Sequence, residues 1–360
     1  MERRITLKPG PSAAASEAPQ SVRIWREQLR QAVRDPDRLI DLLELSEELR
    51  EPARRAAELF GLVVPHAYLQ RMRIGDANDP LLRQVLPLGD ETVAAPAGFV
   101  TDPLAESDAV RAAGMLQKYH GRALLIVAGV CAVACRYCFR RHFPYDESPA
   151  SLEQWQPALA EIAANPDIEE VILSGGDPLM RGDDWLRELV ARIEEIEHVR
   201  RLRIHTRLPI VIPDRVDEQL LGWLGATRLA PTVVVHSNHA AEIDEACGAA
   251  LLRMVKGGVP VLNQTVLLRG VNDDVDALAE LSKALLDVRV MPYYLHQLDP
   301  VVGAAHFEVA EARGKELVQE LRKRLPGFGV PRYVREVAGA EHKVEFAPSV
   351  ASDSSQAGDA

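Results

Sequence analysis

Residues 123–138 read ALLIVAGVCAVACRYC, a short apolar run with β-branched residues that leads directly into three cysteines. A run of this length and composition predicts a strand. Cys131, Cys135 and Cys138 then fall in the loop after the strand, with the spacing C-x3-C-x2-C. The segment therefore predicts a thiol-rich loop at the carboxyl end of one strand.

Five more runs of the same kind follow, and amphipathic helical patterns lie between them. The runs are EEVILSGG (169–176), RLRIHTRL (201–208), APTVVVHS (230–237), PVLNQTVLL (260–268) and RVMPYYLH (289–296). This alternation predicts an α/β fold with a parallel sheet, either doubly wound or part of a β/α barrel.

Polar residues at the ends of these strands favour the barrel. Ser174 to Asp177, His205, His236, Gln264 and His296 all lie near the carboxyl end of a predicted strand, where barrel active sites assemble. We therefore predict a partial (βα)6 barrel with an N-terminal helical region.

The rest of the chain is predicted as segments around this barrel. We expect tails at 1–20 and 349–360, a helical region at 21–116, the partial barrel at 117–300 and a C-terminal segment at 301–348. Asp35-Pro36-Asp37 is a typical helix start. The Pro- and Gly-rich stretch that runs up to Leu116 is expected to be irregular and to pack on the barrel.

Composition excludes several classes of protein. The 360 residues are 47% hydrophobic and 26% charged, as in ordinary globular proteins. The formal charge of -11 has the wrong sign for general binding to nucleic acid. No apolar run reaches the roughly 20 residues of a membrane span, and no signal peptide follows the first methionine, so we predict a cytoplasmic protein without nucleic-acid or membrane partners.

The cysteine loop predicts a metal centre rather than disulfides. Three thiolates on one loop can hold three irons of a four-iron cluster and leave the fourth iron open. A structural zinc site is the alternative, with His142 as a fourth ligand, but the spacing fits no common zinc motif. Cys247 stands alone in a helical pattern and is expected to be a small buried apolar residue.

The loop resembles that of the radical S-adenosylmethionine (SAM) superfamily, whose members bind SAM at the open iron of a [4Fe-4S] cluster. The segment Ser174-Gly175-Gly176-Asp177-Pro178 resembles the superfamily's GGxP-type segment, which lines the methionine moiety of SAM. Glycine allows close backbone approach, although Gly-Gly alone is more often an ordinary turn. The resemblance thus implies [4Fe-4S] and SAM as cofactors.

Residues from about 77 to 346 resemble the lysine 2,3-aminomutases, and especially those that serve β-lysylation of elongation factor P. The matching stretches are NDPLLRQVLP, CAVACRYCFRRHFPY, SGGDPL, RLRIHTRLPIVIP, NQTVLLRGVND and MPYYLHQLDPVVGAAHFEV. The resemblance implies conversion of L-α-lysine to β-lysine by a 1,2-amino migration, with pyridoxal 5'-phosphate (PLP) as a third cofactor. It also implies a functional link to elongation factor P and its lysylating ligase.

PLP requires a Schiff-base lysine, and only seven of the 42 basic residues are lysines. Four lie on predicted helices and one in a tail, which leaves Lys118 and Lys343. Lys343 falls where the aminomutases place their PLP lysine, although residues 338–342 read AGAEH where the family has a glycine run. Lys118, Tyr119 and Arg122 resemble the family's phosphate-binding segment, and cations suit a phosphate dianion.

Lysine as a substrate needs a cation for its carboxylate and carboxylates for its distal ammonium. The resemblance implies that Arg140 binds the carboxylate and that Asp299 and Glu336 bind the ammonium. At the position of Glu336, lysine 2,3-aminomutase itself has aspartate. His236 and Gln264 match SAM contacts of the family, and a buried side chain satisfied by the backbone is the alternative for each.

Two other functions remain as alternatives. A radical SAM lyase or activase would share the cysteine loop but would not need Lys343 or Asp299, so bound PLP separates the two. A non-catalytic scaffold around zinc or iron would explain the thiols alone, and reductive cleavage of SAM separates it from an enzyme.

Overall fold

The computed structural model describes residues 20–346. Gln20, the last residue of the predicted N-terminal tail, begins helix α1; the rest of that tail and the whole of 349–360 lie outside the described residues. None of the helices in the described range combines the length and the apolar composition that a membrane span requires.

Six parallel strands form the centre of the fold, as predicted. They are β3 (Arg122–Ala128), β4 (Glu170–Gly175), β5 (Arg201–Thr206), β6 (Ala230–His236), β7 (Val261–Val266) and β8 (Met291–His296). They are hydrogen-bonded in sequence order, and each pair is parallel. Their carboxyl ends therefore meet at one edge, which confirms the partial barrel.

Four short strands extend the sheet beyond these six. β1 (Val110–Ala112) and β2 (Met115–Leu116) add antiparallel strands beside β3. The prediction that the stretch up to Leu116 is irregular is therefore wrong for these residues. β9 (Arg332–Arg335) pairs parallel with β8, and β10 (Val344–Glu345) pairs with β9. Strands this short carry too little periodicity to be detected in the sequence.

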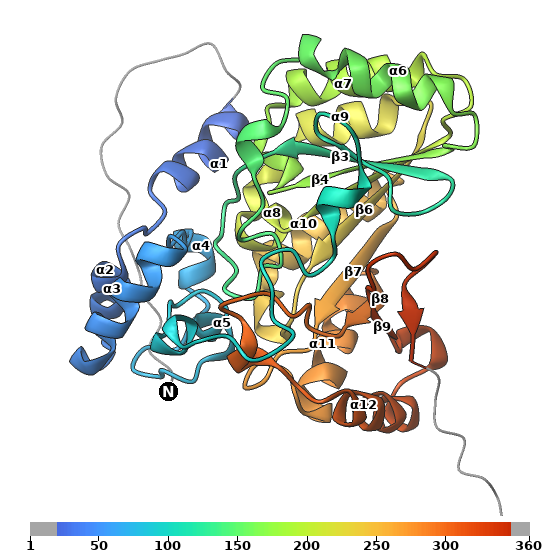
Figure 1. Ribbon diagram of the computed structural model, residues 1–360. Helices are drawn as coiled ribbons and strands as arrows, with labels where there is room; N and C mark the ends of the chain where they lie inside the picture. Colours follow the sequence, from blue (N-terminus) through green and yellow to red (C-terminus); the bar gives the residue numbers. More distant parts are fainter. Residues whose placement is uncertain (1–19, 347–360) are drawn as a thin grey trace, which may run out of the picture.

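Helices cover the sheet and form the N-terminal region. Figure 1 shows α1 to α5 grouped on one side of the molecule and α12 on another. The N-terminal helices are α1 (Gln20–Arg30), α2 (Pro36–Leu42), α3 (Arg50–Leu59), α4 (His66–Leu69) and α5 (Pro80–Arg83). The others are α6 (Gln156–Ala164), α7 (Asp183–Glu194), α8 (Leu208–Val211), α9 (Glu218–Ala226), α10 (Glu245–Lys256), α11 (Val275–Asp287) and α12 (Glu311–Arg324).

Aspartate caps start many of these helices. The Asp35 side chain accepts from the backbone N–H of Asp37, and Pro36 is the first residue of α2, which confirms the predicted start. Asp217, Asp244 and Asp274 cap α9, α10 and α11 in the same way. Cys247 is fully buried in α10, as expected.

One large apolar core joins the N-terminal helices to the barrel. It includes Trp25, Leu39 and Tyr68 from the first region and Val171 and Leu202 from the sheet. A second core lies between α11, α12 and β8 and includes Leu278, Leu295 and Leu317. The helical region is therefore packed against the barrel, and it can position residues of the site.

Candidate active site

A cavity of ≈ 560 Å³ opens at the carboxyl ends of the parallel strands. The predicted catalytic, cofactor-binding and cluster residues line this cavity: Lys118, Tyr119, Arg122, Cys131, Cys135, Cys138, Arg140, Ser174, Gly175, Gly176, Asp177, His236, Gln264, Asp299, Glu336 and Lys343. The structure thus brings together residues that are more than 200 positions apart in the sequence.

A buried ion pair anchors the cysteine loop through Arg136, which lies between Cys135 and Cys138. Arg136 donates through Nη2 to Glu91 Oε2 at 2.6 Å, and both side chains are fully buried. The backbone N–H of Arg136 donates to Gln84 O at 2.9 Å, which ties the loop to the N-terminal region. Among the described residues, no three His, Cys, Asp or Glu side chains converge on one point as a single metal ion would need. His142, the alternative zinc ligand, is exposed, with Nε2 3.3 Å from Val302 O, and it does not line the cavity with the three cysteines.

The glycine pair after β4 packs against the start of the cysteine loop. A Cβ on Gly175 would lie 2.6 Å from Ala128 O, and one on Gly176 would lie 2.5 Å from Val130 O. Gly175 also has φ = 115°, which favours glycine. The close approach that these glycines allow is therefore to the chain's own backbone, beside the cavity.

Asp177 has a different environment from the one the sequence suggested. Its Oδ1 accepts from Thr206 Oγ1 and Leu179 N, and its Oδ2 accepts from Arg207 N and Leu208 N, at 2.6 to 3.0 Å. Burial raises the pKa of this carboxyl, against the effect of these hydrogen bonds. Both oxygens accept hydrogen bonds within the protein, so Asp177 fixes the end of β5, and its predicted place beside SAM stays a prediction.

Arg140 lies beside the cysteines with its guanidinium already paired. Its Nε and Nη2 donate to the two carboxylate oxygens of Glu106, each at 2.7 Å, and Nη1 donates to Ser174 Oγ at 3.0 Å. The predicted role of Arg140 at the substrate carboxylate stays a prediction, and the structure adds that two of its nitrogens already pair with Glu106. Nη1 also donates to Gly175 O at 3.4 Å, whereas Nη2 has one acceptor among the described residues and so keeps a second N–H for another.

A chain of alternating charges continues from Glu106 along the cavity wall. Lys118 Nζ lies 3.0 Å from Glu106 Oε1 and donates to Glu336 Oε1 at 2.9 Å. Glu336 Oε2 in turn accepts from Lys343 Nζ. Burial would raise the pKa of Glu336, but the charges of Lys343 and Lys118 outweigh it and hold the pKa well below its usual range. Lys118, expected at a phosphate, is bound between two carboxylates.

Asp299 lies near the same end of the cavity without a cation in direct contact. Burial and then the neighbouring charge of Glu336 raise the pKa of Asp299 to about 7, and Lys343 and Lys118 oppose the shift. A carboxyl in this state gains by meeting a cation, because a cation favours its charged form. A cation placed beside Asp299 would therefore lower the pKa of this carboxyl and favour its charged form.

Three histidines and Gln264 line the wall between the two ends. His296 Nε2 lies 2.9 Å from Gln264 Oε1, and Gln264 Nε2 lies 3.4 Å from His205 Nδ1. The ring centroids of His205 and His236 are 5.9 Å apart in an edge contact. Burial lowers the pKa of His236 to about 4, so this ring is neutral at pH 7.

Arg122 and Tyr119 form the rim beside β3. The Arg122 guanidinium lies over the Tyr119 ring, 5.3 Å from its centroid, and within the described residues it forms no ion pair. Burial and the Glu336 carboxylate raise the pKa of Tyr119, so it remains a neutral hydroxyl. This pair offers a cation and a hydroxyl that suit an anion.

The sequence analysis missed three charged residues of this region: Glu106, Arg207 and Glu242. Glu106 comes from the stretch expected to be irregular, and no local pattern marks it. Arg207 directly follows β5, two residues after His205, so the argument from strand ends could have found it. Glu242 follows β6 by six residues and contacts Arg207, with Nη2 2.9 Å from Oε2.

Comparison with known proteins places these features in a family. Residues 125–224 match the radical SAM superfamily. L-Lysine 2,3-aminomutase of Escherichia coli (strain K12) is 50% identical over 320 residues, which cover 89% of this chain and 93% of that protein. L-Lysine 2,3-aminomutase of Clostridium subterminale is 33% identical over 327 residues, covering 90% and 78%.

Among solved structures, the similarity is weaker. Streptococcus suis SuiB bound to S-adenosylmethionine aligns with a TM-score of 0.44 at 12% identity, covering 61% of this chain and 51% of that one. The sequence matches are far stronger and extend over nearly the whole length of both proteins. From these matches, the chain belongs to the lysine 2,3-aminomutase family of radical SAM enzymes, which are isomerases.

Proposed function

We propose that this protein converts L-α-lysine to β-lysine by a 1,2-amino migration that uses a [4Fe-4S] cluster, SAM and PLP. One observation carries the proposal. A single cavity combines three clustered thiols with a row of alternating charges that ends at Lys343. When bound, the cluster supplies an electron that cleaves SAM to a carbon radical, and PLP supplies an electron-delocalising ring.

The residues fit the cluster and SAM. Cys131, Cys135 and Cys138 all face the cavity, and burial raises the pKa of the Cys138 thiol to about 11, so its thiolate needs a neighbouring cationic centre. The Nε2 atoms of His205 and His236 line the same cavity and have no hydrogen-bond partner in the described chain. Buried polar atoms without a partner are expected to meet a ligand or water. In this proposal, Ser174 and the backbone of Gly175 and Gly176 border SAM, with His236 and Gln264.

The residues also fit PLP. Lys343 is a partly buried amine, 22% exposed, that reaches the cavity from the segment before β10. We assign Arg122 and Tyr119 to the phosphate, because they offer a cation and a hydroxyl that no carboxylate occupies. Lys118 directly precedes Tyr119 in the sequence, but its amine pairs with Glu106 and Glu336, so in this proposal it must leave Glu336 to reach the phosphate.

The charge pattern supports lysine as the substrate. Arg140 lies at the cluster end, where the second N–H of its Nη2 can meet a carboxylate. Asp299 and Glu336 lie at the other end and can share the ε-ammonium. Because the pKa of Asp299 is about 7, a bound ammonium would draw this carboxyl into its charged form. A neutral or acidic amino acid would bring no distal cation to Asp299, which has no ion-pair partner among the described residues, whereas Glu336 already pairs with Lys118 and Lys343.

The proposal extends to a place in the cell. We propose that the β-lysine formed serves the modification of elongation factor P by its lysylating ligase, in the cytoplasm. The support is the resemblance of the sequence motifs, which includes MPYYLHQLDPVVGAAHFEV. Residues 117–300 form the barrel unit in this proposal, with 301–348 as the segment that carries the PLP lysine.

Anaerobic reconstitution tests the function directly. The chain would be loaded with iron, sulfide and PLP, then given SAM, a reductant and L-lysine, and the products would be separated and identified. We expect β-lysine, formed only when all three cofactors are present. Cleavage of SAM without any β-lysine, or turnover of alanine and glutamate as readily as lysine, would contradict the proposal.

A further inference from the structure

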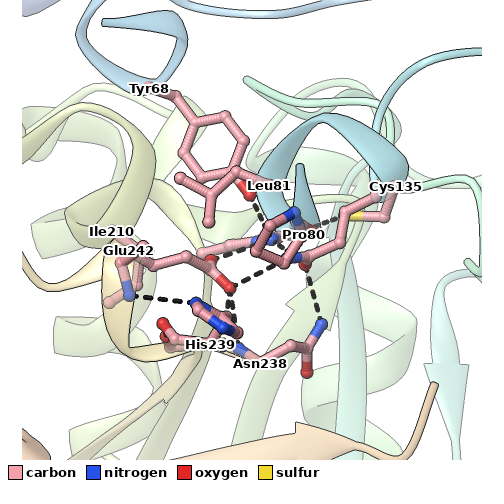
Figure 2. A network of polar contacts seen from close by, with 12 residues as sticks. Tyr68, Pro80, Leu81, Cys135, Ile210, Asn238, His239 and Glu242 are labelled. Atoms are coloured by element: carbon pink, nitrogen blue, oxygen red, sulfur yellow. Dashed lines mark hydrogen bonds and ion pairs between the residues drawn. The ribbon is translucent and has the colours of Figure 1, made fainter. Parts of the chain in front are cut away.

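A buried arginine contacts the sulfur of Cys135. Arg207 is 6% exposed, and its Nη1 donates to Cys135 Sγ at 2.7 Å and to the Tyr137 hydroxyl at 2.7 Å. Figure 2 shows the surrounding polar network, in which Cys135, Tyr68 and Glu242 converge from different parts of the chain. No side-chain donor reaches Cys131 or Cys138 within the described residues, so this contact is particular to one of the three thiols.

The guanidinium is held in place by its other contacts. Its Nη2 donates to Gln84 Oε1 at 2.6 Å and to Glu242 Oε2 at 2.9 Å. The rings of Tyr68 and Tyr137 flank it, with centroids 5.6 and 5.7 Å from Cζ. Because Nη1 and Nη2 each donate to more than one partner, the guanidinium cannot turn away from the sulfur without breaking several buried hydrogen bonds.

The backbone and the N-terminal region complete the support. Arg207 N donates to Asp177 Oδ2 at 2.7 Å, so the residue after the glycine pair fixes the base of this side chain. Tyr68 comes from α4 and Gln84 directly follows α5. The N-terminal helices thus hold a charge against the cysteine loop, which gives them a role in the site beyond packing.

The effect of the contact between Arg207 and Cys135 on a bound cluster depends on the balance of charges around it. Arg207 is paired with one carboxylate, Glu242, which also accepts from the backbone N–H groups of Asn238 and His239. Reduction of an iron–sulfur cluster adds a negative charge that is shared with its thiolates. A cationic donor on one sulfur stabilises this more negative state, and hydrogen bonds to the sulfurs are known to tune cluster potentials.

We propose that Arg207 is a positioning residue that raises the reduction potential of the cluster through Cys135, with Glu242 as the counter-charge that limits the increase. The inference rests on the proposed function, because it requires the cluster on Cys131, Cys135 and Cys138. It predicts opposite effects for the two partners. Loss of the arginine lowers the potential, whereas loss of the carboxylate charge raises it.

Potentiometric titration followed by electron paramagnetic resonance measures this directly. Wild type, Arg207→Met, Glu242→Gln and the control Arg215→Met would be reconstituted with iron and sulfide without oxygen. Arg215 is a matched control because it is also fully buried and pairs with a carboxylate, Asp183, at 2.8 Å. We expect a more negative midpoint for Arg207→Met, a more positive one for Glu242→Gln and no shift for Arg215→Met.

Each outcome decides between the claims. Unchanged midpoints in cluster-loaded Arg207→Met or Glu242→Gln, or shifts in the same direction for both, would overturn the role of Arg207 and leave the proposed function intact. If Arg207→Met does not fold, the sign of the shift in Glu242→Gln decides alone. A wild-type protein that binds no cluster would instead overturn the proposed function itself.

Discussion

The two ends of the cavity hold their charges differently. At the cluster end, Glu242 is fully buried and Arg207 is 6% exposed, and each has several fixed partners. At the far end, the side chains of Lys118, Glu336 and Lys343 are 14 to 22% exposed. The two lysine amines there share the single carboxylate of Glu336. The first arrangement suits a permanent cluster, and the second suits a charged ligand that comes and goes, because exchange of ion-pair partners costs less where water has access.

The largest effect is expected from removing the thiols. Changing Cys131, Cys135 or Cys138 to alanine should abolish both the cluster and the cleavage of SAM, because each of these clustered thiolates is expected to hold one iron. Iron analysis and product assays would measure this. Cys247→Ala is the control and should keep both, since this residue is buried in α10. Full iron loading in a variant that lacks all three clustered cysteines would show that the cluster end is misassigned.

The next effect tests whether the two ends are independent. Lys343→Ala should lose the PLP that borohydride fixes to the protein, because an amine is required for that bond, while the cluster remains. Peptide mass spectrometry after reduction would locate PLP in the wild type. If PLP is found on Lys118, the assignment of the far end is wrong.

Asp299→Asn should reduce kcat/KM for lysine by about 10²- to 10⁴-fold, because leaving a buried charge without its partner costs about 3–5 kcal/mol. In the wild type, kcat/KM should rise with pH through about 7, where the Asp299 carboxyl of the free enzyme loses its proton and gains the charge that binds ammonium. The variant should lose this rise. Asp184→Asn, at a side chain that is 91% exposed, is the control and should leave the pH profile unchanged.

A change at Glu106 tests how the two ends are joined, because this carboxylate binds both Arg140 and Lys118. Glu106→Gln should lower the free energy of unfolding by about 3 kcal/mol, as expected when a buried ion pair loses one charge. Denaturant unfolding would measure it. Glu27→Gln, which breaks an exposed pair with Arg30, should change stability by less than about 1 kcal/mol. Equal effects would contradict the burial argument.

The smallest effect is expected from Glu336→Asp. The substitution keeps the charge and removes one methylene, so Lys343 and Lys118 cannot both stay within hydrogen-bond distance. We expect a change of a few-fold in KM for lysine with the cluster and the PLP content unchanged. Steady-state kinetics and cofactor analysis would check it, and a loss of bound PLP would show that Glu336 holds Lys343 rather than the substrate.

The sequence by itself determined the features that neighbouring residues encode. The six apolar runs predicted the six parallel strands, and the spacing of Cys131, Cys135 and Cys138 predicted a loop at a strand end. Polar residues such as His236 and Gln264 could be assigned to one edge, because carboxyl ends of parallel strands share it. Strand periodicity depends on local side chains, so it is visible without any tertiary information.

Only the tertiary structure decided how the charges pair. Arg140 forms its ion pair with Glu106, 34 positions earlier, and Lys118 binds Glu336, 218 positions later. It likewise revealed the contact of Arg207 with Cys135 and the short strands β9 and β10 that carry the far end of the site. Coulombic and hydrogen-bond energies depend on distances in space, and a charge that appears free in the sequence can be neutralised by a residue from another part of the chain.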